Sequence, residues 1–297
     1  MVENKTIGSR IRVAVTYTIV ILLTLLCLFP IWNMVCISFS SATMVAANKV
    51  TLFPREFTLE AYTLILEDSA FWRSFSISVC RVLLALTINL AMIVLMAYPL
   101  SKTRREFNGR NIIMGFLVFA MLFSGGMIPG YLVVKELGLL NTIWALVLPG
   151  AVPISNTIMT MNFISGLPDS LEEAAVLDGA NPLQILTRII IPCSKPSMAT
   201  MALFSIVGNW NEFYAGLIYM TKSKNYPLMT YINSLQVDVG ALISEETSMD
   251  ALEKLYELSG KNLNAAKVVV AVVPLMLIYP FLQKYLIHGI VMGAVKE

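Results

Sequence analysis

A polar pentapeptide inside an apolar segment offers the clearest chemistry in this sequence. It interrupts the apolar stretch 197–220 and consists of Asn209, Trp210, Asn211, Glu212 and Phe213. An acid at the centre of a membrane costs about 2.5–3.5 kcal/mol, so such residues normally face a cavity or a partner. Amide and carboxylate groups can hydrogen-bond sugar hydroxyls, and aromatic rings can stack on the apolar face of a sugar. The same groups could instead join two membrane subunits by hydrogen bonds, and the sequence leaves both functions open.

A second candidate site lies in the polar stretch 163–196, between two apolar segments. Ser170 and Glu173 have the spacing of a capping box that begins a helix, and Gly179 can end that helix in a left-handed conformation. The candidate docking residues of this stretch are Glu172, Glu173, Ala174, Ala175, Asp178, Gly179 and Pro192. A helix of about eight residues would be about 12 Å long, and its alanines would let another surface approach closely. We therefore expect this stretch to bind a partner outside the membrane.

A second short helix is predicted to follow in the same stretch. Asn181 and Pro182 have the residue types of an N-cap and a first helical position. Pro192 is expected to end this helix near Ile190, because proline lacks the backbone donor that continues a helix. The stretch is thus predicted to fold as two short helices joined by a turn at Gly179.

The composition is that of a membrane protein with several spans. The chain has 297 residues, of which 57% are hydrophobic and 13% charged. Soluble domains carry about 25% charged residues. The net charge of +2 is too small to suggest nucleic-acid binding. The four cysteines have neither CxxC nor metal-ligand spacing, so we expect them to be small apolar residues rather than ligands.

Six apolar segments are long enough to cross a membrane as helices, which takes about 20 residues. They are 13–38, 76–99, 111–132, 141–162, 197–220 and 266–288. Glycine and proline interrupt the third segment at 125–130 and the fourth at Gly150 and Pro153. Such breaks are tolerated where neighbouring helices or a wet cavity satisfy the freed backbone groups. The sequence therefore predicts an all-α membrane protein with six transmembrane helices packed around an internal path.

Basic residues in short loops predict which side of the membrane is cytoplasmic. Three basic residues precede the first segment and four lie in 101–110, so both regions are expected in the cytoplasm. Alternation then places 163–196 and both termini there, with 39–75 and 221–265 outside. The first apolar segment is too long for a cleaved leader and is predicted to be a signal anchor. In the second outer loop, Met249–Ser259 has the pattern of an amphipathic helix.

Isolated polar residues in other segments have simpler interpretations. Arg81 lies near the outer end of the second segment, where its long side chain can reach the membrane interface. Asn89 is expected to hydrogen-bond a neighbouring helix. The sequence contains no GxxxxGK[ST] pattern, nucleophile elbow or HExxH, and no constellation of paired carboxylates for acid–base catalysis. We therefore expect no catalytic residue, no metal site and no cofactor in this chain.

The stretch 163–196 resembles the EAA loop of permease subunits in binding-protein-dependent ABC importers. That loop has Glu-Ala-Ala, three residues, glycine, nine residues and Ile-x-Leu-Pro. Here the matching residues are Glu173 to Ala175, Gly179, and Ile189 to Pro192, with Ile191 in place of the leucine. The run from Glu172 to Ala180 is most similar to the carbohydrate-uptake branch, which includes the maltose-type and complex oligosaccharide permeases. The resemblance covers most of the chain from about residue 50.

The resemblance implies a type I ABC importer permease in a bacterial plasma membrane. It implies a short coupling helix, around Glu173 to Gly179, that seats in an ATPase subunit. The implied partners are a second homologous permease, two ATPase subunits that bind ATP-Mg, an extracytoplasmic solute-binding protein, membrane lipid and a carbohydrate substrate. The expected divisions are 1–72 (tail, first helix and outer loop), 73–288 (transmembrane domain with the loop 163–196) and 289–297 (cytoplasmic tail).

Other functions stay open at this point. The closest is an ABC importer permease for a peptide, polyamine or other non-sugar solute. An ion-driven secondary transporter would need intramembrane ionisable residues and usually repeat symmetry. Within the spans only Glu212 fits that requirement, and no repeat is visible. A membrane scaffold that transports nothing is a further alternative.

Overall fold

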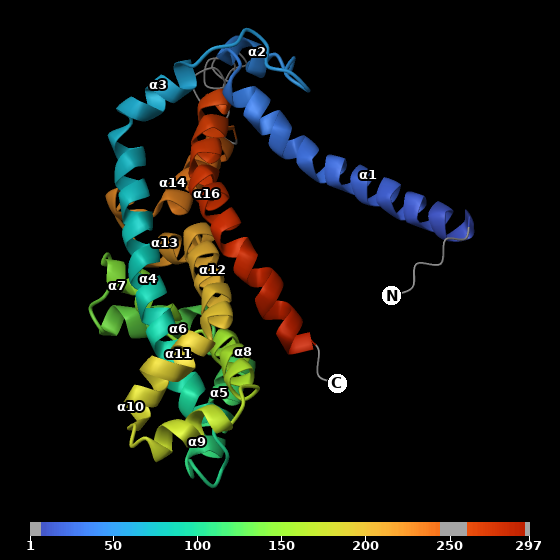
Figure 1. The fold of residues 1–297 in the computed structure, drawn as a ribbon. Coiled ribbons are helices and arrows are strands. Elements are labelled where there is room, and N and C mark those ends of the chain that lie inside the picture. The colour runs from blue at the N-terminus through green and yellow to red at the C-terminus, as the bar shows by residue number, and fades with distance from the viewer. Residues whose placement is uncertain (1–6, 244–259, 295–297) are drawn as a thin grey trace. The chain divides into compact units, whose positions relative to one another are not determined.

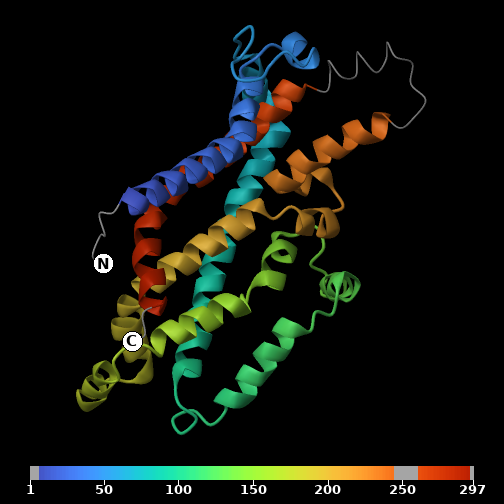
Figure 2. The ribbon, with the colours of Figure 1, turned by 90° about the vertical axis from the view of Figure 1, so that its right-hand side faces the viewer.

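The computed structural model describes residues 7–243 and 260–294, and helices dominate this part of the chain (Figure 1 and Figure 2). The expected helix at Met249–Ser259 lies outside the described residues. The longer helices are α1 (Ile7–Ser38), α4 (Ser69–Ser101), α5 (Arg110–Leu122), α6 (Met127–Glu136), α8 (Ile154–Ile164), α12 (Lys195–Asn211), α14 (Leu228–Ile243) and α16 (Lys261–Ala294). The shorter ones are α2 (Ala42–Ala46), α3 (Glu60–Glu67), α7 (Ile143–Val147), α9 (Ser170–Leu177), α10 (Pro182–Ile185), α11 (Ile191–Cys193) and α13 (Tyr214–Tyr219).

Three of these helices are long and apolar enough to cross a membrane by themselves. They contain the candidate spans Ile11–Ser38, Ser69–Ser101 and Lys261–Pro280. Three further candidates are pairs of helices bent at a short break, which gives up to six spans among the described residues if each pair counts as one. The all-α fold predicted from the sequence is therefore confirmed.

The bent pairs lie at breaks that glycine and proline introduce. The pair α5 and α6 bends by 115° after Gly125 and Gly126, and the second of these has φ of +87°. The helices 143–150 and 154–164 are bent by 46° at a break that ends with Pro153. Both interruptions were predicted from the sequence, because glycine permits positive φ and proline removes a backbone donor. The third bend, of 80°, separates Pro182–Cys193 from α12.

The chain divides into two compact units. The described parts of Met1–Ser69 and Ser234–Val272 form the first unit. Within it, the indole of Trp32 donates to the Leu52 carbonyl at 2.8 Å, which fixes the loop after α1 to that helix. Another contact inside this unit is the ion pair of Lys267 with Asp68 at 2.7 Å, which joins α16 to the end of α3.

The second unit, Ala70–Asn233 with Val273–Glu297, contains both candidate sites. α4 lies along α12 and α13 and ends close to α9 (Figure 1). Residues on one stripe of α4 are buried at every third or fourth position from Phe71 to Leu100. At its C-terminal end this stripe joins an apolar core that also holds α9 and α10 in place. That core consists of Val94, Ala97, Leu100, Leu117, Met161, Ile164, Ala175, Ile185, Leu186 and Ile190.

A close contact within the second unit gives a test of its packing. Thr230 is fully buried, and its hydroxyl donates to the Phe213 carbonyl at 2.7 Å. A Cβ on Gly216 would meet the side chain of Thr230, with the two Cβ atoms 2.8 Å apart. Gly216→Ala is therefore expected to destabilise the chain by about 1–3 kcal/mol through overpacking. Thermal unfolding of the purified chain in detergent measures this loss.

The matched control for that substitution is Gly115→Ala in α5. No atom lies within 4 Å of a Cβ built at this position. Alanine favours a helix by about 1 kcal/mol over glycine, so this variant should be as stable as the original chain or more so. Equal unfolding temperatures for the two variants would show that the helices around Gly216 do not pack as described.

Candidate functional site

The first candidate site is the short helix α9, which has a buried face and an exposed face. Ala175 is buried in the core described above. By contrast, Leu177 is 88% exposed and Val176 is 61% exposed. Glu173 and Ala174 are exposed too. Two bulky aliphatic side chains on an exposed turn at the end of a helix form an unpartnered apolar surface.

The end of α9 has the geometry expected from its glycine. Gly179 has φ of +80°, the left-handed conformation that glycine adopts at no steric cost. The amide of Gly179 donates to the Val176 carbonyl at 3.0 Å, and the amide of Ala180 donates to the Ala175 carbonyl at 2.9 Å. These two bonds form a complete Schellman motif, which satisfies carbonyls that a helix end would otherwise leave free. The prediction that Gly179 closes the helix is confirmed.

The start of α9 differs from the prediction. The helix begins at Ser170 with Asp169 in the N-cap position, and no side chain caps it. The predicted capping box of Ser170 and Glu173 is therefore wrong, because Ser170 is already a helical residue. Glu172 and Glu173 nevertheless lie in the first turn, where their negative charge interacts favourably with the helix dipole.

The following helix starts as predicted but does not end as predicted. Asn181 and Gln184 form a capping box with both bonds at 2.9 Å, and Pro182 takes the first helical position. Pro192 was expected to end the helix, but helical backbone continues through Cys193. A wide π-helical turn at Leu186–Ile190 comes directly before it. Such a turn accommodates the proline, which lacks an amide and would clash with a carbonyl of a regular helix.

The buried side of α9 also makes an ion pair with Lys102, the residue that directly follows α4. The ammonium of Lys102 contacts the Glu172 carboxylate, and it lies 4.7 Å from the centre of the Tyr98 ring. Both charged side chains are largely buried, so this pair is screened less than a surface pair. Next to it, Glu106 accepts bonds from the hydroxyl and the amide of Thr103. These bonds lower the pKa of Glu106 and order the loop after α4.

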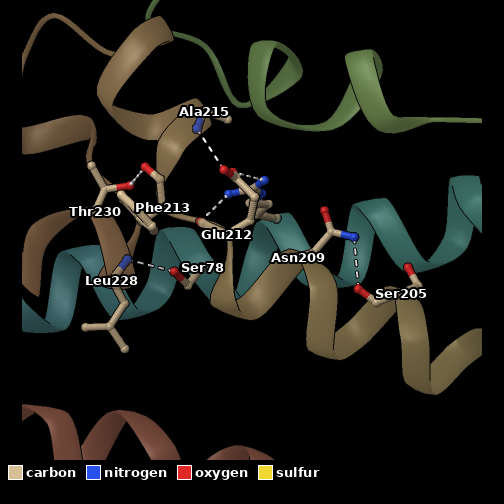
Figure 3. A network of polar contacts seen from close by, with 9 residues as sticks. Ser78, Ser205, Asn209, Glu212, Phe213, Ala215, Leu228 and Thr230 are labelled. Atoms are coloured by element: carbon tan, nitrogen blue, oxygen red, sulfur yellow. Dashed lines mark hydrogen bonds and ion pairs between the residues drawn. The ribbon is translucent and has the colours of Figure 1, made fainter. Parts of the chain in front are cut away.

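The second candidate site is the break between α12 and α13. The sequence predicted one continuous span over 197–220, and this is wrong, because α12 ends at Asn211 and α13 begins at Tyr214. The carboxylate of Glu212 accepts a hydrogen bond from the Ala215 amide at 2.9 Å (Figure 3). Glu212 thereby satisfies a free donor at the start of α13.

Arg81 of α4 donates hydrogen bonds to Glu212 in this break. Its guanidinium donates to the Glu212 carbonyl at 3.0 Å and to the Glu212 carboxylate at 2.8 Å. The expectation that Arg81 reaches the membrane interface is wrong, since its side chain is only 4% exposed. A buried guanidinium requires a partner, and Glu212 supplies both a charge and a carbonyl. A broken helix at membrane depth is tolerated where such groups satisfy its backbone.

A cavity of ≈ 380 Å³ lies beside the break. Of the predicted pentapeptide, Asn209 and Glu212 line it, and Trp210 is buried edge-on against Phe75, with ring centres 5.7 Å apart. Asn209 donates to the Ser205 carbonyl at 2.9 Å (Figure 3). The other lining residues are Arg81, Met127, Ala145, Leu146, Pro149, Gly150, Gly208, Tyr214, Ala215, Ile218 and Tyr219. The cavity thus combines a carboxylate, an amide and two tyrosines on mostly apolar walls, which is typical of a small-molecule site.

The two tyrosines were missed by the sequence analysis. Tyr214 and Tyr219 lie just after the pentapeptide, and the helical break carries them to the cavity. The sequence feature that could have identified them is their position directly after the polar pentapeptide. Within the described residues, no group of three or more His, Cys, Asp or Glu could hold a metal ion.

Asn89 joins α4 to α12, as predicted. Its amide lies 3.2 Å from the Ser205 hydroxyl, and turning the amide lets its nitrogen donate to the Ala85 carbonyl at 3.0 Å. Hydrogen bonds between membrane helices average about 0.6 kcal/mol. Asn89→Leu should therefore lower stability by about that amount, measured as a small fall in the unfolding temperature. Ser205→Ala should have a similar effect, and a fall as large as that from losing a buried ion pair would contradict this account.

The fold and its two sites define a class of protein. A set of apolar helices with a polar cavity at a helical break, and an exposed short helix at the end of the bundle, is the arrangement of a transport component. Residues 90–291 match the family described as binding-protein-dependent transport system inner membrane component. The chain belongs to this family, and it is a membrane-spanning permease subunit of the ABC transporter type.

Individual relatives agree with this assignment. The chain is 38% identical to the protein LplC of Bacillus subtilis over 91% of this chain and 89% of LplC. It is 35% identical to the polygalacturonan/rhamnogalacturonan transport system permease protein YtcP of the same organism, over 97% and 99% of the two chains. A crystal structure of a bacterial ABC transporter that imports the acidic polysaccharide alginate contains a chain with a TM-score of 0.83 and 30% identity. That match covers 95% of this chain and 98% of the other.

Proposed function

We propose that this chain is the permease subunit of an ATP-driven importer of oligosaccharides. The observation that carries the proposal is the two-sided helix α9, with Ala175 in the core and Val176 and Leu177 on the outside. A short, capped helix with an unpartnered apolar surface offers another protein a place to bind. In a chain without a P-loop, that partner is the ATPase that supplies the energy.

The docking surface consists of the exposed part of α9 and the turn that follows it. Leu177 and Val176 are its apolar contacts, and Glu173 and Asp178 supply negative charge beside them. Gly179 closes the turn with φ of +80°, and no atom of the chain lies within 4 Å of the place a Cβ would take, so the space beside it is open to a partner. We place this surface, and both termini, on the cytoplasmic side, in line with the basic residues of the N-terminal tail and of 101–110. In this proposal the transmembrane domain is 73–288, with the docking loop 163–196 inside it.

The substrate class follows from relatives and from the cavity. Relatives are named for transport of polygalacturonan and rhamnogalacturonan, of trehalose and maltose, and of arabinooligosaccharides. The cavity has acceptors at Asn209 and Glu212 that can bind sugar hydroxyls, and the rings of Tyr214 and Tyr219 that can stack on a sugar ring. The named substrates of these relatives favour a carbohydrate over a peptide or a polyamine, and the cavity has groups that can bind one.

The proposed mechanism is alternating access in a complex with four other protein subunits of three kinds. A solute-binding protein delivers the sugar to the outer side, and a second homologous permease completes the path. Two ATPase subunits bind ATP-Mg and close together, which moves α9 and opens the bundle outward. Hydrolysis returns the bundle to the inward state. This chain supplies the path and the docking helix and performs no chemistry.

Uptake measured under two kinds of energy depletion tests this function. Cells that produce the chain together with its proposed partner subunits would be given labelled oligosaccharides released from polygalacturonan and, separately, labelled maltose. Uptake of one of them should disappear when ATP is depleted, persist when an uncoupler removes the ion gradient, and require the chain. Uptake that stops with the uncoupler while ATP remains would indicate an ion-driven transporter. Uptake of both sugars that is unchanged without the chain would contradict a carbohydrate permease for these substrates.

A further inference from the structure

We propose that α4 connects the docking helix to the cavity through two ion pairs, Lys102–Glu172 and Arg81–Glu212. This inference rests on the proposed function and assigns Lys102, Glu172 and Arg81 as positioning residues for it. Glu172 then acts on the inner side of α9 rather than in contact with the ATPase.

The first pair fixes α9 to the end of α4. Glu172 and Ala175 are three residues apart and lie on the same face of α9, toward the core. The Lys102 ammonium contacts both the Glu172 carboxylate and the Tyr98 ring, so it has two partners. A neighbouring hydrogen bond joins the end of α8 to the end of α4, since the Ser165 hydroxyl donates to the Ser101 carbonyl at 3.3 Å. A force on α9 therefore reaches α4 through a charged contact and not only through apolar packing.

The second pair fixes α4 to the wall of the cavity. Arg81 holds both the carbonyl and the carboxylate of Glu212, and Glu212 in turn caps α13. A movement of α4 must therefore either carry the break between α12 and α13 with it or separate these groups. Tyr214 and Tyr219 on α13 would then move relative to the other walls of the cavity.

The stretch of α4 between the two pairs is suited to transmit movement. Arg81 and Lys102 are 21 positions apart in the sequence, which is about 30 Å along a helix. Between them the helix is continuous to Ser101, with a proline only at Pro99 in its last turn. Its buried stripe runs through the whole length, so the helix is packed against its neighbours from one pair to the other.

The Arg81–Glu212 pair has an unsatisfied donor, as expected for a contact that rearranges between two conformations of the transporter. The buried Nε of Arg81 has no hydrogen-bond partner among the described residues. An unsatisfied buried donor costs free energy, so an arrangement that satisfies it can compete with the present one. Coupling between two sites requires such an element with two arrangements of similar free energy.

Charge reversal at the first pair tests the inference. The assembled complex would carry Tyr214→Cys as a reporter in the cavity, with serine in place of Cys27, Cys36, Cys80 and Cys193. The rate of maleimide labelling would be measured in lipid nanodiscs with and without ATP and vanadate. In the reference complex the nucleotide should change this rate by about fivefold or more. Lys102→Glu or Glu172→Lys should abolish most of that change while the ATPase still co-purifies, and the double reversal should restore it.

Arg105→Glu is the matched control, because it reverses a charge in the same loop at an exposed side chain. It should leave the nucleotide response intact. A full response in both single reversals, with the ATPase bound, would overturn the inference and leave the proposed function standing. Loss of the response that the double reversal does not restore would also overturn it. If no ATPase co-purifies with the reference chain, the proposed function fails and this inference fails with it.

Discussion

Glu212→Ala is expected to destabilise the chain more than Arg81→Ala, although both substitutions break the same ion pair. Removing one partner of a buried pair costs about 3–5 kcal/mol when it leaves a buried charge without compensation. Glu212→Ala leaves the Arg81 guanidinium as a buried charge without compensation, because the arginine side chain is only 4% exposed. Arg81→Ala leaves a carboxylate that is 34% exposed and still accepts the Ala215 bond. Thermal unfolding of the purified chain in detergent should show this order.

The double variant Arg81→Met/Glu212→Ala provides the control for this prediction. It removes both charges and keeps an unbranched side chain in the position of the arginine. It should be more stable than Glu212→Ala alone, because no unpaired charge is left buried. If the two single variants lose equal stability, or if the double variant loses the sum of both, the pair does not hold the break between α12 and α13 as described.

Gly179→Val is expected to lower import strongly by changing the end of α9. Gly179 has φ of +80°, and a left-handed conformation costs an ordinary residue about 1–2 kcal/mol, with β-branched residues the least tolerant. The turn would open, and the two bonds of the Schellman motif would be lost with it. The amount of ATPase recovered with the chain should fall about tenfold, as should uptake, for a cost near 1.4 kcal/mol.

Gly179→Asn distinguishes two possible causes of a binding defect in Gly179→Val, backbone strain at this residue and steric crowding by the new side chain. Asparagine adopts the left-handed conformation more readily than other residues with a side chain. No atom of this chain lies within 4 Å of a Cβ at this position, so crowding can come only from a partner. Near-normal recovery of the ATPase with asparagine and loss with valine would support the strain account. Loss with both would indicate that the partner contacts the glycine itself.

Much of the fold could be predicted from local sequence signals. Apolar length predicts the long helices, and glycine and proline predict the breaks near Gly126 and Pro153. Gly179 and Asn181 predict the end of one short helix and the start of the next. These features are local, since the residue that causes each of them lies at the feature itself.

Two ion pairs that the sequence analysis did not predict join residues far apart in the sequence. Arg81 and Glu212 are 131 positions apart, and Lys102 and Glu172 are 70 apart. Nothing in the periodicity of α4 indicates which side chain of another helix faces Arg81. The break at Glu212 contains neither glycine nor proline, and it is stabilised by the distant arginine and by the capping of α13. The sequence could therefore identify Glu212 as an unusual residue but could not find its partner.

The most direct test of the central claim is recovery of partner proteins with the tagged chain. The original chain and Leu177→Asp would be purified from the native membrane in mild detergent, and the bound proteins identified by mass spectrometry. Leu177 is 88% exposed, so the substitution should leave the fold intact and disturb only a surface that binds a partner. The account predicts an ATPase and a second permease with the original chain, and loss of the ATPase alone with Leu177→Asp. Recovery of no ATPase with the original chain would contradict the account.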